Sequence, residues 1–243
     1  MLKVACPNCG AEVLFRSPAL PVKVCDYCRT AVTRIGEGVR SLGKVADLPF
    51  DVSPIRIGTR GRFDQNASGA RAFEVIGRVR WGWTDGSWNE WLLMFDDAIG
   101  AGDSPWAAGG RPAHGWLGEA MGQFMLTVEI PFDEVRSTNI RRLAKGEKVA
   151  VGAEARIGDE VMTIADIKRA RCISSEGELP WPTPLGWTID SVDLRSPSGA
   201  CASVQRDGQE TSVYAGRYVT LDELGVTGLR AIEGWAMPRF AAG

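Results

Sequence analysis

The sequence of 243 residues lacks long hydrophobic runs, and its apolar stretches stay as short as Trp91–Phe95. A membrane-spanning helix needs about 20 apolar residues, so no such segment is expected. The start of the chain also lacks the apolar stretch of a secretory signal, which predicts a cytoplasmic location with reduced thiols. Only one histidine and three tyrosines are present, so the supply of catalytic side chains is small.

An excess of charge of one sign is also missing, because 28 basic residues face 30 acidic ones. The net charge of −2 excludes a global attraction to nucleic acid. The charges are nevertheless divided along the chain: residues 1–80 hold 13 basic and 7 acidic residues (net +6), whereas residues 81–243 hold 15 and 23 (net −8). Tryptophan is abundant, with nine residues, six of them between Trp81 and Trp116.

Four cysteines near the start form two C-x2-C pairs, which are separated by fifteen residues: Cys6, Cys9, Cys25 and Cys28. Two such turns supply four thiolates in the tetrahedral arrangement of a closed structural zinc site. We therefore predict one structural Zn²⁺ in a zinc ribbon over residues 1–35, with iron as the alternative metal. Cys172 and Cys201 have no such partner and are expected to be buried free thiols.

The rest of the chain predicts a mainly β protein with few helices. Residues 36–54 are expected to form a linker, followed by two small SH3-like or barrel-type β modules at 55–135 and 136–243, which resemble a degenerate duplication. The Asp85-Gly86 pair predicts a hairpin in which Trp83 faces Trp88. Residues 98–114, which include Trp106, are expected to form a long inserted loop.

Several short motifs occur along the chain: the first C-x2-C pair with Gly10, Leu42–Ala46, Ile57–Gly61, Phe73–Arg78, Trp88–Trp91, Gly115–Leu117, Glu176–Pro180 and Gly216–Val219. Together they resemble the bacterial domain-of-unknown-function 4178 family. The resemblance implies a cytoplasmic β-rich protein without an assigned reaction. It also implies a gene that lies beside genes for phage-shock or ESCRT-III-like membrane-remodelling proteins, small membrane proteins and polyamine-synthase-like enzymes.

An enzyme is disfavoured because the single histidine, His114, lies in the inserted loop and is expected to face solvent. Nucleic-acid binding by the zinc ribbon is the main alternative, with phosphate contacts from basic residues of the first half. The arginines considered for these phosphate contacts are Arg56, Arg60, Arg62, Arg71, Arg78 and Arg80. A second alternative is a ligand-binding accessory of a polyamine-type enzyme.

The favoured hypothesis is a non-enzymatic adaptor in a membrane-stress system, which binds protein partners and could also self-assemble. Trp88 and Trp91 are expected in the core, because two small barrels need large side chains to fill them. The candidate partner- or ligand-binding residues are Trp83, Glu90, Trp106 and Trp181. Trp106 and Trp181 stand in Pro- and Gly-rich segments, where an exposed aromatic side chain indicates binding.

Overall fold

The structure is a computed structural model that describes residues 1–36, 38–48, 53–64, 70–96, 113–132, 135–184, 186–208 and 210–232. Fifteen strands and one helix make up the described part, which confirms the mainly β fold class. The N-terminal strands are β1 (Leu2–Ala5), β2 (Glu12–Phe15), β3 (Val22–Val24), β4 (Thr30–Ile35) and β5 (Gly38–Lys44). The others are β6 (Arg60–Asp64), β7 (Ala70–Trp83), β8 (Gly86–Phe95), β9 (His114–Ala120), β10 (Gln123–Ile130), α1 (Thr138–Ala144), β11 (Glu154–Ile157), β12 (Glu160–Leu179), β13 (Thr188–Arg195), β14 (Ala200–Asp207) and β15 (Glu210–Val219).

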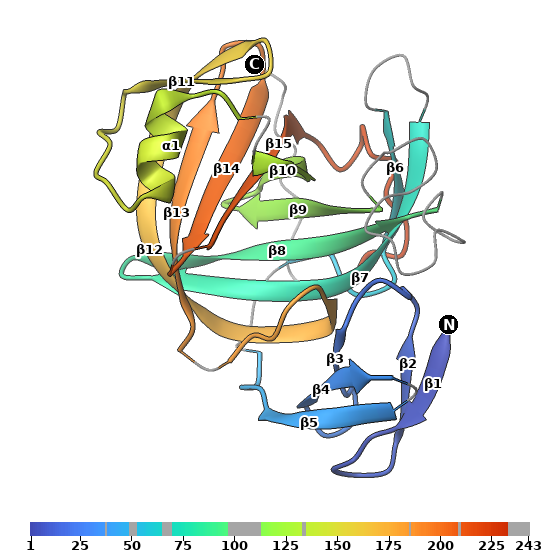
Figure 1. Cartoon of the computed structure of the whole chain (residues 1–243). Coiled ribbons are helices and arrows are strands. Elements are labelled where there is room, and N and C mark those ends of the chain that lie inside the picture. Colours follow the sequence, from blue (N-terminus) through green and yellow to red (C-terminus); the bar gives the residue numbers. More distant parts are fainter. Residues whose placement is uncertain are drawn as a thin grey trace.

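Eight of these strands form a closed antiparallel ring. Their order is β7-β8-β9-β10-β15-β14-β13-β12, and an additional pairing between β12 and β7 closes it. The long strand β12 makes this possible, because its residues 163–171 pair with β13 and its residues 171–177 pair with β7. Figure 1 shows β7 and β8 running across β12, with β13 and β14 beside the upper part of that strand. The ring is therefore a small barrel.

The ring closes where two glycines pair, Gly77 of β7 with Gly177 of β12. A Cβ atom on Gly77 would lie 1.9 Å from the carbonyl oxygen of Glu178, closer than any real contact. Gly177 has a φ of 74°, a left-handed conformation that side chains disfavour. The two backbones can approach this closely only because both positions lack a side chain.

The two predicted modules do not form separate barrels. Strand β10 of the first pairs with β15 of the second, and β7 pairs with β12, so the strand pairing crosses the predicted boundary at residue 135. One ring of eight strands replaces the expected pair, because the sequence pattern shows strands but not which distant strands pair. The SH3-like form and the exact domain bounds stay predictions.

Three apolar clusters correspond to the inside and the two outer faces of the ring. The inner cluster contains tryptophans of β7, β8 and β9 together with Leu20 and Val22 of the N-terminal segment. A second cluster lies outside β7, β8 and β10 and is completed by Ile55, Phe63 and residues 219–224. The third lies outside β12, β13 and β14 under α1 and β11. The C-terminal segment thus packs on the first half of the chain.

The hairpin of β7 and β8 has the predicted faces with a different register. Trp81, rather than Trp83, lies opposite Trp88, and Trp83 lies opposite Gly86. Gly86 leaves room for the Trp83 ring, whose nearest atom would be 2.8 Å from a Cβ at that position. The register differs by two residues, so the same side chains still share each face. Trp91 is fully buried, as predicted, whereas Trp88 is partly buried.

The N-terminal unit extends beyond residue 35. Residues 38–44, which the sequence placed in a linker, form β5 and pair with β4. Nearly all of β5 is exposed, so it carries no apolar alternation that could predict a strand. Strand β3 pairs with β12 through Lys23 and Glu178, which joins this unit to the ring. Figure 1 shows the unit lying against the β7 and β12 side of the ring.

We predict that Gly77→Ala destabilises the protein, because the added methyl group collides with the β12 backbone. The expected loss is about 3 kcal/mol, which lowers Tm by roughly 10 °C in a chain of this size. Thermal unfolding followed by circular dichroism measures it. Gly38→Ala is the control, because its Cβ would have only an ordinary contact at 3.7 Å. Equal losses in the two variants would contradict the role given to the glycine pair.

Candidate functional site

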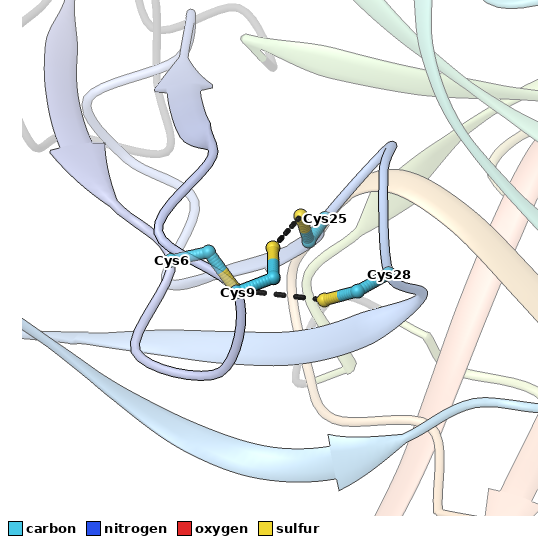
Figure 2. Close-up of side chains that lie close together, drawn as sticks. All are labelled: Cys6, Cys9, Cys25 and Cys28. Atoms are coloured by element: carbon cyan, nitrogen blue, oxygen red, sulfur yellow. Dashed lines mark hydrogen bonds between the residues drawn. The ribbon is translucent and has the colours of Figure 1, made fainter.

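The four N-terminal cysteines come together at one point, as the C-x2-C spacing predicts. Their sulfur atoms all lie within 4.8 Å of one another. The Cys6 and Cys28 sulfurs are 3.7 Å apart, and the Cys9 and Cys25 sulfurs are 3.8 Å apart. Figure 2 shows all four side chains converging from two facing loops. One metal ion could be bound by the four together.

The two loops that carry the cysteines have matching hydrogen bonds. The amide of Gly10 donates to the Cys6 carbonyl at 2.9 Å, and the amide of Arg29 donates to the Cys25 carbonyl at 3.0 Å. Both donors have positive φ angles, 76° at Gly10 and 59° at Arg29. A non-glycine residue is strained there, so Arg29 must be held by other contacts.

Arg29 is held by hydrogen bonds to the ring. Its guanidinium group donates to the Ser175 carbonyl oxygen at 2.8 Å and to the Ser174 hydroxyl at 3.1 Å. A second connection comes from Glu178 at the end of β12, which is fully buried and accepts the amides of Arg16 and Ser17 at 2.8 and 2.9 Å. Burial raises the pKa of the Glu178 carboxyl group. The N-terminal unit of strands β1–β5, which carries the four cysteines and is called the cysteine unit below, is therefore fixed to the barrel by polar contacts.

The sequence predicted a solvent-exposed His114, and this prediction is wrong. The residue lies at the start of β9 in a partly buried position. Its Nε2 atom is 3.0 Å from the Ser17 hydroxyl, and burial lowers the pKa of its ring to about 4. A serine beside a histidine is the pair that nucleophilic catalysis requires. Ser17 is only 2% exposed, however, so no substrate reaches it in this structure. The pair connects the cysteine unit to β9.

A cavity of about 370 Å³ lies inside the ring, and all eight ring strands contribute to its wall. Its volume is within the usual range for small-molecule sites. The wall is both aromatic and charged. It includes Trp83, Trp88, Trp116, Tyr214, Tyr218, Met121, Met125, Glu90, Glu119, Asp166, Lys168, Asp193, Arg195, Ser203 and Gln205. The exposed side chains of Met121 and Tyr218 mark its open end.

Glu90 lies in the wall of this cavity and accepts three hydrogen bonds. The indole N–H groups of Trp81 and Trp88 donate to it at 2.8 and 3.1 Å, and the Gln205 amide donates at 2.7 Å. Gln205 belongs to β14, so this last bond crosses the interior of the ring. Burial raises the pKa of Glu90 to about 7, although the three donors oppose the shift.

Other titratable groups in or beside the cavity are also perturbed. Burial raises the pKa of Asp193, while the Ser203 hydroxyl and the positive charge of Lys168 lower it. Lys168 itself is paired with Asp166. The thiols of Cys172 and Cys201 are buried, as expected, and their pKa values rise to about 12 because of burial. A thiol with such a pKa is a poor nucleophile at neutral pH.

Of the four candidate binding residues, the structure brings Trp83 and Glu90 together at the cavity. Trp181 lies behind it and stacks on Trp116 at 5.6 Å with an interplanar angle of 13°. Trp106 lies outside the described residues. No pattern in the sequence singles out Gln205, Asp193 or Trp116, because their shared position depends on the closed ring. An alternating polar residue inside a strand such as β14 is the only signal that could have indicated them.

A family model described as "Domain of unknown function (DUF4178)" matches residues 57–221. The chain belongs to the DUF4178 family. Neither a curated protein nor a solved structure matches it. The matched span contains all eight ring strands and the cavity wall, whereas the four cysteines precede it. The barrel and its cavity are therefore the DUF4178 part of the molecule. The described residues contain no helix that is long and apolar enough to cross a membrane.

We predict that the purified DUF4178 protein carries about one tightly bound metal ion per chain. Cys9→Ser should abolish this stoichiometry, because the remaining three thiolates leave the coordination shell open. Elemental analysis of protein prepared under reducing conditions measures it. Cys201→Ala is the control, since this buried thiol lies outside the cluster. Full metal content in Cys9→Ser would contradict the assignment.

We also predict that the unfolding free energy of the protein depends on pH because of Glu90. Because its pKa is higher in the folded protein than in the unfolded chain, its contribution to stability is full below about pH 4.5 and is lost as pH rises through about 7. The loss is on the order of 3 kcal/mol. The difference in unfolding free energy between wild type and Glu90→Gln isolates it, since the opposite contribution of His114 is present in both. A difference that stays flat or grows between pH 5 and 7 would refute this origin.

Proposed function

We propose that this DUF4178 protein is a non-catalytic binding protein that holds a small molecule inside its barrel. The observation that carries the proposal is the cavity, whose wall all eight ring strands build. Ordinary barrel interiors of this size are filled by side chains, whereas ligand-binding barrels leave space for one small ligand. The proposal corresponds to the ligand-binding alternative from the sequence.

The composition of the wall supports binding. Aromatic rings from three strands, Trp83, Trp88 and Trp116, offer apolar surface, and a few polar groups are fixed among them. Recognition sites for small molecules combine a mostly apolar wall with a small number of placed polar groups. Glu90 and Gln205 meet this description, because hydrogen bonds hold both side chains.

Binding rather than turnover is supported by the nucleophiles near the cavity. Cys172 and Cys201 have thiol pKa values raised to about 12. His114, the only histidine of the chain, is not part of the cavity wall and contacts the buried Ser17. General-base catalysis needs a base within hydrogen-bond reach of the group that it deprotonates. Glu90 is the carboxyl group with a suitable pKa, but its hydrogen-bond partners are the N–H groups of two indoles and one amide, none of which is a nucleophile.

We further propose that the four-cysteine cluster holds a structural zinc ion. Four sulfurs at 2.3 Å from a central ion lie about 3.8 Å apart in a tetrahedron, and two of the sulfur pairs here are 3.7 and 3.8 Å apart. Four thiolates close the coordination shell, so zinc would supply folding energy rather than chemistry. A reducing compartment such as the cytoplasm keeps these thiols available.

An adaptor role remains a second proposal, together with its membrane-stress setting. The observation that favours it is the exposed face of the cysteine unit, where Tyr27 is 81% exposed and β5 forms an open sheet edge. Ligand binding and partner binding are compatible, because they use different surfaces.

The nucleic-acid alternative is weakened, because two of the arginines considered for phosphate contacts make other contacts. Arg71 and Arg78 are buried and lie over the rings of Phe95 and Trp91 at 3.8 and 4.5 Å.

The binding proposal predicts that native mass spectrometry of the purified protein, or a thermal-shift screen of small metabolites, finds a ligand that stabilises the wild type. Gly118→Leu should lose this ligand, because Gly118 pairs with Glu90 and lies in the cavity wall. A Cβ there would meet only Met125, at 3.8 Å, so the fold tolerates the change. Gly38→Ala serves as the control.

Loss of the ligand in Gly118→Leu, with an unchanged circular dichroism spectrum, is the expected result. Ligand binding that survives a filled cavity would place the site elsewhere and contradict the proposal.

A further inference from the structure

The cavity contains a carboxyl group whose surroundings are built for a negative charge. Each oxygen of Glu90 accepts at least one N–H group, from Trp81, Trp88 and Gln205. The groups that point at the carboxyl group are all N–H donors, so in this arrangement they offer no acceptor to a proton on it. The hydrogen bonds therefore favour the ionised form.

The same carboxyl group has no counter-ion in the protein. Among the residues that the structure describes, no lysine, arginine or histidine lies within ion-pair distance of Glu90. The basic residues of the cavity wall are Lys168, which is paired with Asp166, and Arg195, which is exposed. Glu90 is only 9% exposed, and a buried charge without a partner is costly. The arrangement is complete only when a positive charge enters the cavity.

The aromatic part of the wall suits the same ligand. Trp83, Trp88 and Trp116 line the cavity, and the faces of indole rings attract cations. One of these rings already holds a cation, because the Lys168 ammonium nitrogen is 5.0 Å from the Trp83 ring centroid. Asp193 adds a second carboxyl group, close enough to raise the pKa of Glu90. Anionic ligands would be repelled by both acids.

We infer that the ligand of this cavity is an organic cation whose ammonium group pairs with Glu90 and whose apolar part packs against Trp83, Trp88 and Trp116. The inference rests on the proposed function and names the chemical class of its ligand. The volume of about 370 Å³ limits the class to small molecules. Gln205 fixes the carboxylate from the opposite side of the ring, so it is a positioning residue.

Proton release accompanies the binding of such a cation. Near pH 7 Glu90 is partly protonated, and the incoming charge ionises it. The other titratable and charged groups that line the cavity or lie beside Glu90 are Glu119 of β9, Asp166, Lys168 and Cys172 of β12, Asp193 and Arg195 of β13, and Tyr214 and Tyr218 of β15. The positive charge of the ligand would also lower the raised pKa of Asp193.

The test uses three probes of one shape and different charge: 2-phenylethylammonium, 2-phenylethanol and 3-phenylpropanoate. Isothermal titration calorimetry at pH 7 measures their affinity for the full-length protein. We expect the ammonium compound to bind at least about tenfold more tightly than the alcohol, with the carboxylate weakest. The tenfold ratio corresponds to about 1.4 kcal/mol. Titration in two buffers of different ionisation enthalpy should show net proton release with the ammonium compound only.

Glu90→Gln should weaken the affinity for 2-phenylethylammonium by at least about tenfold and leave the affinity for 2-phenylethanol unchanged. Glu210→Gln is the matched control, because Glu210 is an exposed acid at the start of β15. Asp193→Asn is a second variant, with a smaller selective loss expected. It decides the question if Glu90→Gln fails to fold, as judged by near-ultraviolet circular dichroism.

The outcomes separate the inference from the proposed function. If the alcohol or the carboxylate binds as well as the ammonium compound, or if the Glu90 and Asp193 variants keep full selectivity, the cation inference is overturned and the ligand-binding function stands. If none of the three probes binds at millimolar concentration, the cation inference is overturned, and the ligand screen with Gly118→Leu alone decides the ligand-binding function. Ammonium selectivity that depends on Glu90 supports both.

Discussion

The pairing of β7 with β12 is the contact on which the rest of the molecule depends. It joins two strands far apart in the sequence, and it requires a glycine on each side, Gly77 and Gly177, because the backbones approach within the space of a methyl group. Without it the eight strands would form an open curved sheet with an exposed edge. With it they enclose a space, and the same strand β12 continues to Glu178, where the cysteine unit is attached. The cavity and the metal cluster are thus connected to one strand.

Inside the ring, two physical demands on Glu90 oppose each other. The donors from two indoles and one amide stabilise a carboxylate, whereas the loss of water destabilises it, and the result is a pKa of about 7. Such a balance is sensitive to any charge that enters. Groups of this kind gather at functional sites more often than elsewhere, although structural networks also produce them. The position of Glu90 in the wall of a cavity distinguishes it from a purely structural acid such as Glu178.

How far the sequence could predict the structure differs between the two sites. The cluster of Cys6, Cys9, Cys25 and Cys28 could be predicted from the sequence, because each pair lies within one loop and the spacing determines its geometry. The faces of the β7–β8 hairpin could also be predicted, since side chains alternate along each strand and the observed register differs from the predicted one by an even number of residues. The closure of the ring could not, because local patterns say nothing about the pairing of β10 with β15, about 90 residues later. The contact between Glu90 and Gln205 could not be predicted for the same reason. Strand β5 could not be predicted because nearly all of it is exposed, so its sequence shows no apolar alternation.

One consequence concerns how fast the cavity can be filled and emptied. Hydrogen-bonded strands surround it on every side, and Leu20 and Val22 of the N-terminal segment pack with the tryptophans of the inner cluster. A molecule inside therefore enters and leaves past the same rim, beside Met121 and Tyr218. Residence time then depends on these two side chains, while equilibrium occupancy depends on the interior. Changes at the rim would alter association and dissociation rates together and leave their ratio almost constant.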